Sequence, residues 1–541
     1  AFAPGDDMER LMRENDLPLY GLESLDPLKD FHLLGFTLQT ELSFTNILNM
    51  LDLSGIPLLA KDRADLFPLI HAGGPCAYNP EPLADFIDFF VIGEGEEVQP
   101  EFIAAVQQYR AEGGTDKVEL LRRLAGIEGI YVPRFYDATY HEDGTLASFT
   151  PNDPAAKPIV TKRLVKDIDN IYYPDQVVVP FADVVHDRVM LEVFRGCIRG
   201  CRFCQAGIVY RPYREKSVEK ISSCAADCVR YSGYSEISLS SLSISDYSEI
   251  RRLIDELLGW TEPRSISLSL PSMRIDAFYG ELMRKVMSVR KSGLTFAPEA
   301  GTQRLRDVIN KNITEAEILA GCREAFDNGR TALKLYFMNG LPTETDADIE
   351  GIAALAQRIV DAFYETKRNG KGFNVTVSVS CFVPKPFTPF QWEAQDSIAA
   401  LERKQQLLRD AIRTRKITYH YHDAHVSYIE AVFARGDRRL SRAILEAVDR
   451  GQRLDGWDEF FRFDTWMEAF AAAGIDPDFY AARRRPYTEL LPWDHIDCGV
   501  SRAFLVRESE KAHAGVTTPD CRTQCAGCGA NRLGGTRSCC P

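Results

Sequence analysis

Alternating apolar and polar positions divide the chain into short strands and amphipathic helices. In the first 110 residues, the apolar runs 31–38 and 89–92 predict strands, whereas the segments 45–53 and 82–86 predict helices. From about residue 189 to residue 389, a strand–helix unit repeats. Strands are expected there at 189–194, 236–239, 265–270, 293–297, 333–338 and 375–382. Repeated βα units form parallel sheets covered by helices, so we expect an α/β protein with a partial (β/α)6 barrel.

The same pattern divides the chain into five segments. The first residues resemble a strand end that runs into a loop, so we expect the N-terminal sheet to be truncated before Ala1. A hairpin is expected around residues 140–144, and a short strand at 417–421 interrupts the helical pattern of the C-terminal region. The expected segments are an open parallel α/β sheet (1–110), an insert and linker (111–185), the barrel (186–392), a helical domain (393–510) and a cysteine-rich tail (511–541).

Composition and charge narrow the class of protein. The chain has 541 residues, 45% of them apolar, and no stretch approaches the roughly 20 consecutive apolar residues of a membrane span. We therefore expect no membrane partner. The 14 cysteines are clustered as ligands are, which indicates the reducing cytoplasm rather than a disulfide framework. A formal net charge of −14 gives no electrostatic support to a nucleic-acid or ribosome partner.

Three cysteines, Cys197, Cys201 and Cys204, lie within eight residues, with glycines between them and a predicted strand in front. Thiolates are soft ligands that select iron–sulfur clusters or zinc. A loop that binds three irons of a [4Fe-4S] cubane leaves the fourth iron open to a small molecule, which indicates a catalytic cluster. The alternative is a zinc site completed by a distant His or Cys.

Residues 195–207, with an aromatic side chain at Phe203, resemble the cluster loop of radical S-adenosylmethionine enzymes. The resemblance implies that the three cysteines bind a [4Fe-4S] cluster and that S-adenosylmethionine binds its open iron, near Phe203. It also implies that an electron from the cluster cleaves S-adenosylmethionine to a 5′-deoxyadenosyl radical. An electron donor such as flavodoxin or ferredoxin is therefore an expected partner.

The resemblance implies roles for residues at other strand ends. Ser240, Ser241 and Ser243 follow the second barrel strand, where the family presents groups to the methionyl amine, although its usual Gly-Gly-Glu-like sequence is absent here. Glu299, just past the fourth strand, is expected to contact the ribose hydroxyls or the amine. Arg304, five residues later, is expected either to pair with a carboxylate or to be solvated. Glu299 and Arg304 are the candidate catalytic residues.

The ends of the fifth and sixth strands complete the predicted cofactor site. Asn339 and Gly340 belong to a loop that resembles the one passing near the adenine in this family. Phe382 and Val383, after the sixth strand, are expected to offer backbone groups to the same base.

Two glycine-rich turns follow apolar runs in the N-terminal sheet. Glycines beyond strand ends let a flat ligand approach the backbone, and they also make tight connections between elements. Ahead of a radical S-adenosylmethionine barrel, these turns resemble the cobalamin-binding domain of the cobalamin-dependent subfamily, specifically a family of uncharacterised function. The Asp-x-His-x-x-Gly signature of many cobalamin proteins is absent. The resemblance implies cobalamin contacts from Gly73, Gly74, Gly93, Glu94 and Gly95.

The tail repeats the spacing of the first cysteine motif. Cys521, Cys525 and Cys528 are separated by three and then two residues, and Cys539 and Cys540 follow. Such a group of thiols indicates an auxiliary iron–sulfur cluster or a structural zinc site, or else thiols without a ligand in a flexible end.

Three functions follow from these features. The first is a cobalamin-dependent radical enzyme that methylates an unactivated carbon of an unknown substrate. The second is a methylthiotransferase-like enzyme that modifies RNA or a ribosomal protein. It is disfavoured because such enzymes carry a cluster-binding N-terminal domain, whereas residues 1–110 contain only Cys76. The third is a cobalamin and iron–sulfur sensor that regulates a partner.

Overall fold

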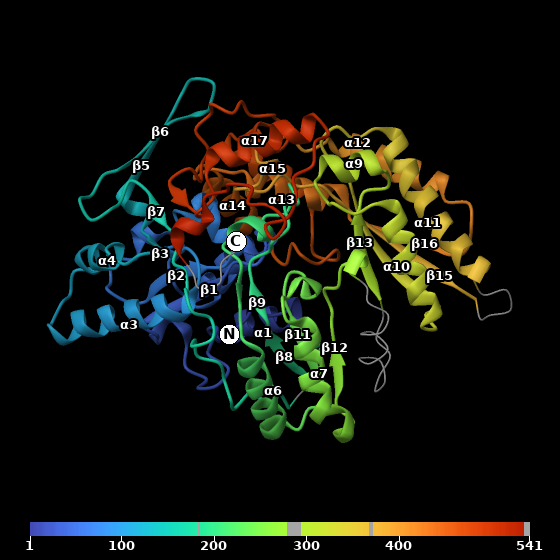
Figure 1. Ribbon diagram of the computed structural model, residues 1–541. Helices are drawn as coiled ribbons and strands as arrows, with labels where there is room; N and C mark the ends of the chain where they lie inside the picture. Colours follow the sequence, from blue (N-terminus) through green and yellow to red (C-terminus); the bar gives the residue numbers. More distant parts are fainter. Residues whose placement is uncertain (182–183, 278–293, 367–371, 535–541) are drawn as a thin grey trace.

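The computed structural model describes residues 1–181, 184–277, 294–366 and 372–534. Parallel sheets are combined with many helices, which confirms the α/β class. In Figure 1 the N-terminal residues (blue) lie at the left, residues from about 300 to 420 (yellow to orange) lie at the right, and the C-terminal helices (red) lie across the top. None of the described helices is long and apolar enough to cross a membrane.

The N-terminal sheet is mainly parallel. The expected strands at 31–38 and 89–92 and the helix at 45–53 are confirmed, and the apolar run before Gly73 forms a further strand. The first three strands are parallel and the fourth is antiparallel to the third. In order across the sheet, the strands are β1 (Leu33–Thr37), β2 (Leu69–Gly73), β3 (Phe89–Val91) and β4 (Ile130–Tyr131), and the helix is α2 (Phe44–Leu53).

Three expectations for this region were wrong. The chain begins with helix α1 (Asp6–Glu14) rather than a strand end, because acidic residues in its first turn favour a helix N-terminus. Residues 82–86 form no α-helix; Pro80 and Pro82 remove backbone donors, and only a 3-10 turn at Glu81–Leu83 is left. β4 lies beyond residue 110, so the N-terminal sheet extends into the segment expected to be an insert. Helices α3 (Gly95–Ala111) and α4 (Lys117–Ala125) precede it.

All six strands expected between residues 189 and 389 are present, although Gly293 lies outside the described residues. They are β8 (Val189–Glu192), β11 (Glu236–Ser240), β12 (Ser267–Ser269), β13 (Thr295–Glu299), β14 (Ala332–Asn339) and β15 (Asn374–Cys381). They form two parallel sheets, in the orders β12-β11-β8 and β13-β14-β15 followed by β16 (Ile417–Tyr421). The six strands therefore do not form one continuous sheet in the part of the chain that is described. The helices of this region are α6 (Val218–Ser232), α7 (Ile250–Thr261), α9 (Gln303–Val308), α10 (Glu315–Asp327) and α11 (Asp346–Thr366).

The C-terminal region is largely helical, as predicted, but it is not separate from the two sheets. Its short strand β16 pairs with β15, and its helices share one hydrophobic core with the N-terminal sheet. Leu48 of α2, Val432 and Trp466 are all buried in that core. The C-terminal helices meet the N-terminal region at α2 and at the turns Glu41–Ser43 and Glu81–Leu83. They are α12 (Ile398–Ala411), α13 (Ala424–Ala434), α14 (Leu440–Asp449), α15 (Phe463–Ala473), α16 (Asp478–Ala481) and α17 (Arg502–His513).

Short strand pairs connect these regions. The expected hairpin is confirmed as β5 (Tyr136–Tyr140) and β6 (Leu146–Pro151). β7 (Val160–Thr161) pairs with β17 (Ile496–Asp497), which joins the segment after the N-terminal sheet to the C-terminal region. β9 (Phe194–Arg195) and β10 (Arg214–Glu215) enclose the first cysteine motif and the short helix α5 (Ala206–Val209).

Candidate functional site

The first cysteine motif, here called the cluster loop (residues 196–205), begins directly after β9. Cys197, Cys201 and Cys204 line a cavity of about 320 Å³ together with residues at the ends of β13 and β14. We call this the cluster cavity. Phe203, Ser243 and Glu299 also line it, so the structure brings these sequence-predicted residues together.

The backbone of the cluster loop is arranged around its sulfur atoms. The Arg199 N–H donates to Sγ of Cys197 at 3.4 Å, and the Gly207 N–H donates to Sγ of Cys204 at 3.3 Å. Burial raises the pKa of Cys197 to about 11 and that of Cys204 to about 12. These thiols are therefore protonated near neutral pH unless a metal takes the place of the proton.

The thiol arrangement fits a cluster better than a single ion. The spacing of the three cysteines suits a cubane, in which each thiolate binds a different iron. The N–H donors to sulfur are also among the features that tune cluster potentials.

Glu299 lies beside a buried lysine in the cluster cavity. Its Oε1 is 3.1 Å from Nζ of Lys311, and its φ of +68° is unusual for a residue with a side chain. Burial opposes the charge of Lys311, but Glu299 and Cys201 together raise its pKa. A protonated lysine thus lies between a carboxylate and the cluster cysteines.

The sequence analysis missed Lys311. The residue is presented by a short loop in which Asn310 and Asn312 have φ values of +53° and +49°. Asparagine tolerates this left-handed conformation better than most residues. The two asparagines indicate a turn in the sequence, but they do not indicate which cavity the lysine side chain enters.

Several buried polar groups at strand ends lack partners. The hydroxyls of Ser241 and Ser243 and both amide atoms of Asn339 form no hydrogen bond within the described chain. Asn339 is only 2% exposed. A buried polar group without a partner costs about 1–3 kcal/mol, so these atoms fit a site that a polar ligand completes.

Five predicted residues at or after the ends of β13, β14 and β15 line neither this cavity nor the larger one described below: Arg304, Asn339, Gly340, Phe382 and Val383. Gly340 has φ +78°, and a Cβ there would lie 2.9 Å from Cδ2 of Leu401. The backbone N–H of Phe382 donates to the backbone carbonyl oxygen of Asn339 at 2.8 Å, and Val383 is the next residue along the chain. Arg304 pairs with Asp348 of α11, so the carboxylate it meets is the protein's own.

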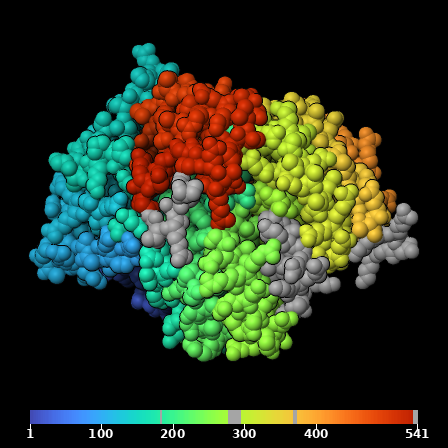
Figure 2. All heavy atoms as spheres, in the orientation of Figure 1, coloured from blue at the N-terminus to red at the C-terminus, as the bar shows by residue number. Residues whose placement is uncertain are grey.

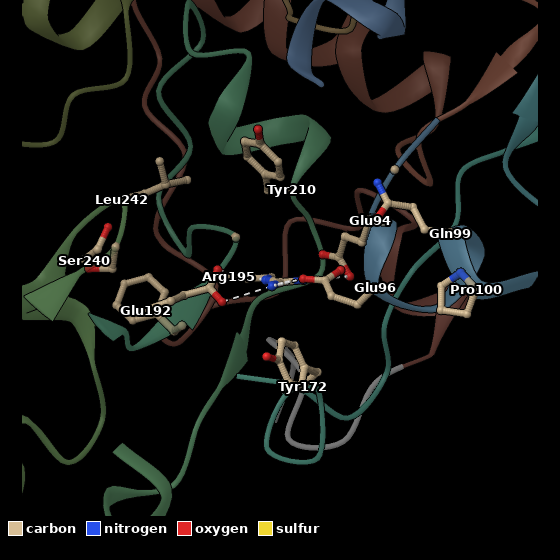
Figure 3. Close-up of a pocket in the computed structure, with 15 residues that line it drawn as sticks. Glu94, Glu96, Gln99, Pro100, Tyr172, Glu192, Arg195, Tyr210, Ser240 and Leu242 are labelled. Atoms are coloured by element: carbon tan, nitrogen blue, oxygen red, sulfur yellow. Dashed lines mark hydrogen bonds and ion pairs between the residues drawn. The ribbon is translucent and has the colours of Figure 1, made fainter. Parts of the chain in front are cut away.

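A larger cavity of about 820 Å³ lies where the N-terminal sheet meets β8 and β11 (Figure 3). Gly93, Glu94, Gly95, Ser240 and Ser241 line it, which brings together predicted residues of both regions. We call it the sheet cavity. Figure 3 shows Tyr210 and Tyr172 on opposite sides of Arg195.

An ion-pair network crosses the sheet cavity. Nε of Arg195 is 2.8 Å from Glu192, and its Nη2 pairs with Glu96 (Figure 3). Glu94 accepts two hydrogen bonds from the buried Arg214, at 2.6 and 2.8 Å. Glu94 therefore connects the start of α3 to β10, the strand that carries Arg214. Sequence reasoning singled out Glu94 but not its arginine partners.

The tight-turn explanation accounts for two of the glycines. Gly74 has φ +108°, and a Cβ there would lie 2.9 Å from the Leu38 oxygen. Gly93 has φ +109°, and a Cβ there would lie 2.1 Å from the Arg163 oxygen. Gly73 and Gly74 line neither cavity, whereas Gly93 and Gly95 line the sheet cavity.

The tail cysteines lie against the cluster loop. The Cys521 N–H donates to the Ile198 oxygen at 3.0 Å. Cys521 and Cys528 are buried and Cys525 is exposed, whereas Cys539 and Cys540 lie outside the described residues. In Figure 2 the C-terminal residues (red) lie between the cyan and the yellow parts of the chain, above the green part.

Two protein-family models match the chain. Residues 191–356 match the radical SAM superfamily, and residues 1–133 match the N-terminal region of radical SAM proteins. An uncharacterised protein of Methanocaldococcus jannaschii is 29% identical over 453 residues, which cover 82% of this chain and 88% of that protein. A provisionally named methylthiotransferase of the same organism is 23% identical over 172 residues, covering 30% of this chain and 37% of that protein.

Solved structures were also matched. TsrM from Kitasatospora setae, a radical S-adenosylmethionine methyltransferase with cobalamin and a [4Fe-4S] cluster bound, is 15% identical with a TM-score of 0.42 and covers 69% of this chain and 67% of its own. The cobalamin-dependent S-adenosylmethionine radical enzyme OxsB is 12% identical with a TM-score of 0.44. The match covers 88% of this chain and 65% of OxsB. The chain thus spans about two thirds of these proteins. TM-scores this low support no inference about its function.

Proposed function

Because the chain belongs to the radical S-adenosylmethionine superfamily, we propose that Cys197, Cys201 and Cys204 hold a [4Fe-4S] cluster whose fourth iron binds S-adenosylmethionine in the cluster cavity. Together these groups supply reductive cleavage of S-adenosylmethionine to methionine and a 5′-deoxyadenosyl radical. The motif spacing and the N–H donors to sulfur support the cluster.

The protein's own residues would orient S-adenosylmethionine. Lys311 carries a positive charge beside Cys201, so it offsets thiolate charge and offers donors to a carboxylate. Glu299 offers acceptors to an amine or to ribose hydroxyls. Ser243 and Asn339 supply buried polar atoms that have no partner in the described chain.

We further propose that the sheet cavity holds cobalamin and that the enzyme methylates an unactivated carbon. One observation carries this proposal: Leu242 lines both cavities, so a ligand in the sheet cavity would lie next to the cluster cavity. Tyr172 and Tyr210 offer aromatic faces to a flat macrocycle. A bound methylcobalamin supplies a transferable methyl group.

The radical chemistry is tested by product analysis after anaerobic iron–sulfur reconstitution. The wild type is expected to form 5′-deoxyadenosine from S-adenosylmethionine with dithionite, and Cys201→Ala is expected to form none. Cys224→Ala, which removes a partly buried thiol on α6 away from both cavities, is the matched control and should retain activity. An intact cluster in a wild type that makes no 5′-deoxyadenosine would refute the enzyme and favour a sensor.

The cobalamin assignment has its own test. Gln99 lines the sheet cavity from α3, whereas Gln107 is exposed two turns later on the same helix. After purification with added hydroxocobalamin, the wild type and Gln107→Trp should keep the visible absorption of a corrinoid. Gln99→Trp, which fills the cavity mouth, should lose most of it. Equal retention by both variants, or none by the wild type, would contradict the assignment.

A further inference from the structure

The tail motif of Cys521, Cys525 and Cys528 has no part in the function proposed above. Its spacing is that of the cluster loop, three residues and then two. Packing in a hydrophobic core could explain the two buried thiols, but it does not explain the exposed one, Cys525. The surroundings of the motif show what it is built for.

The segment before the tail motif is fastened to the cluster loop and to the Lys311 loop. Asp520 lies 3.3 Å from Arg199, next to the Cys521–Ile198 hydrogen bond. The Thr518 N–H donates to Oδ1 of Asn310 at 2.7 Å, and Nδ2 of Asn310 donates to the Gly200 oxygen at 3.0 Å. Asn310 thus joins the tail directly to the backbone of the cluster loop.

A buried ion pair secures the same contact from α17. Arg202 of the cluster loop is fully buried and lies 3.1 Å from Glu508. Its Nη2 also donates to the Val516 oxygen at 2.7 Å. Burying an ion pair is favourable only when its remaining polar atoms are satisfied, as they are here. The tail is therefore a fixed part of the wall behind the cluster loop.

The tail motif itself is also held in place. The Ser501 N–H donates to the Cys528 oxygen at 2.9 Å, and Nη2 of Arg507 donates to the Ala526 oxygen at 2.7 Å. Gly527 and Gly529 have φ values of +65° and +95°, which let the chain turn tightly around Cys528. Loops that bind clusters need this kind of close backbone approach.

A buried arginine lies between the two cysteine motifs. Arg211 is 2% exposed and donates to the Arg199 oxygen at 3.0 Å and the Gly207 oxygen at 2.9 Å. Its Nη1 has no hydrogen-bond partner in the described chain. Burial opposes its charge, but the thiols of Cys528, Cys521 and, more weakly, Cys197 raise its pKa. A buried guanidinium beside the thiols of both motifs fits an anionic sulfur ligand.

We propose that Cys521, Cys525 and Cys528 bind a second [4Fe-4S] cluster, held behind the first by the tail contacts and hydrogen-bonded through Arg211. The repeat of the cluster-loop spacing favours a cluster over a single zinc ion, and zinc is one of the outcomes that the test below distinguishes. The second cluster has one iron without a cysteine from this motif.

The position of the second cluster gives it a role in electron delivery, a role that rests on the proposed function. A one-electron donor of the flavodoxin or ferredoxin class would reduce the exposed Cys525 side of the tail cluster. The same electron would pass to the cluster of the first motif and then to the sulfonium of S-adenosylmethionine. There the C5′–S bond breaks, and methionine and one 5′-deoxyadenosyl radical are formed.

Metal analysis and electron paramagnetic resonance test the site. The reconstituted wild type should hold about eight irons and eight sulfides, two clusters of four. Cys525→Ser should fall to about four irons, because the variant removes one thiolate ligand of the tail cluster at an exposed position. Cys224→Ser should keep about eight. After reduction, the wild type should show two signals, of which S-adenosylmethionine changes one, and Cys525→Ser should lose the unchanged one.

A reciprocal variant separates this proposal from the proposed function. Cys197→Ala/Cys201→Ala/Cys204→Ala should retain about four irons and the signal insensitive to S-adenosylmethionine, whether or not the wild type cleaves that compound. Four irons in the wild type that Cys525→Ser leaves intact, or one zinc lost from Cys525→Ser, would overturn the tail cluster. With dithionite, Cys525→Ser should form 5′-deoxyadenosine normally, but with reduced flavodoxin the rate should fall at least tenfold. Equal rates with flavodoxin would overturn the relay.

Discussion

Replacement of Asn339 by leucine is expected to stabilise the protein and to weaken S-adenosylmethionine binding. Asn339 ends β14 with 2% of its surface exposed, and neither amide atom has a hydrogen-bond partner in the described chain. A buried polar group without a partner costs about 1–3 kcal/mol. Leucine has the same side-chain branching and no polar atoms, so the substitution removes that cost.

The size of both effects follows from the cost of about 1–3 kcal/mol for the buried amide without a partner. The cofactor-free variant should gain about 1–3 kcal/mol, which raises the melting temperature by roughly 2–4 °C per kcal/mol for a unit of about 200 residues. If the amide of Asn339 binds S-adenosylmethionine, a similar energy is lost from the complex. The dissociation constant would then rise roughly 5- to 150-fold.

The assay combines thermal unfolding of the cofactor-free protein with calorimetric titration of the reconstituted protein. Asn49 is the matched control because it is equally buried but satisfied: Nδ2 donates to Glu9 at 2.8 Å and Oδ1 accepts from Arg13 at 3.0 Å. Asn49→Leu should destabilise the protein and leave binding unchanged. Destabilisation of Asn339→Leu, or stabilisation with unaltered affinity, would refute the reasoning.

Three further outcomes are expected. Glu94→Gln leaves Arg214, 1% exposed, without its carboxylate and should cost about 3–5 kcal/mol in thermal unfolding, whereas Gln at the exposed Glu97 should change little. Lys311→Met should lower the affinity for S-adenosylmethionine at least tenfold in the same titration, and an unchanged affinity would remove Lys311 from the site. Burial lowers the pKa of His495 from 6.5 to about 3. As the pH falls below 6.5, the imidazole therefore takes up a proton in the unfolded chain before it does so in the folded protein. The free energy of unfolding then falls by up to about 1.4 kcal/mol per pH unit from pH 6.5 towards 3. His495→Phe should flatten that decline in a pH series of melting temperatures; an identical slope would contradict it.

The strands could be predicted because apolar residues recur along them in short runs or at alternate positions. β14, for example, alternates buried residues with partly or fully exposed ones over eight positions, and its expected bounds differ from the observed ones by one residue at each end. β4 could not be found in this way, since its two residues are too few for any period to be visible. The sharing of one core between the first and last parts of the chain is a long-range property that local periodicity does not contain.

The candidate site likewise contains residues that a local sequence pattern predicts and residues that only the long-range packing brings together. The cluster cysteines are identified by local spacing, and the structure places them in one cavity with Phe203 and Glu299. Lys311 belongs to that cavity through the packing of a distant loop, which no local pattern reports. Arg304 shows the converse. Its place in the sequence suggested a role at the site, but its side chain pairs with Asp348 of α11.

The shared hydrophobic core has a consequence for biosynthesis. Leu48 packs in the same core as Val432 and Trp466, which the ribosome adds roughly 400 residues later. At about 5–20 residues per second, α2 waits on the order of 20–80 seconds for the helices that pack on it. During that time its apolar face is exposed to other nascent chains. We therefore expect the newly made protein to depend on chaperones until its last helices emerge.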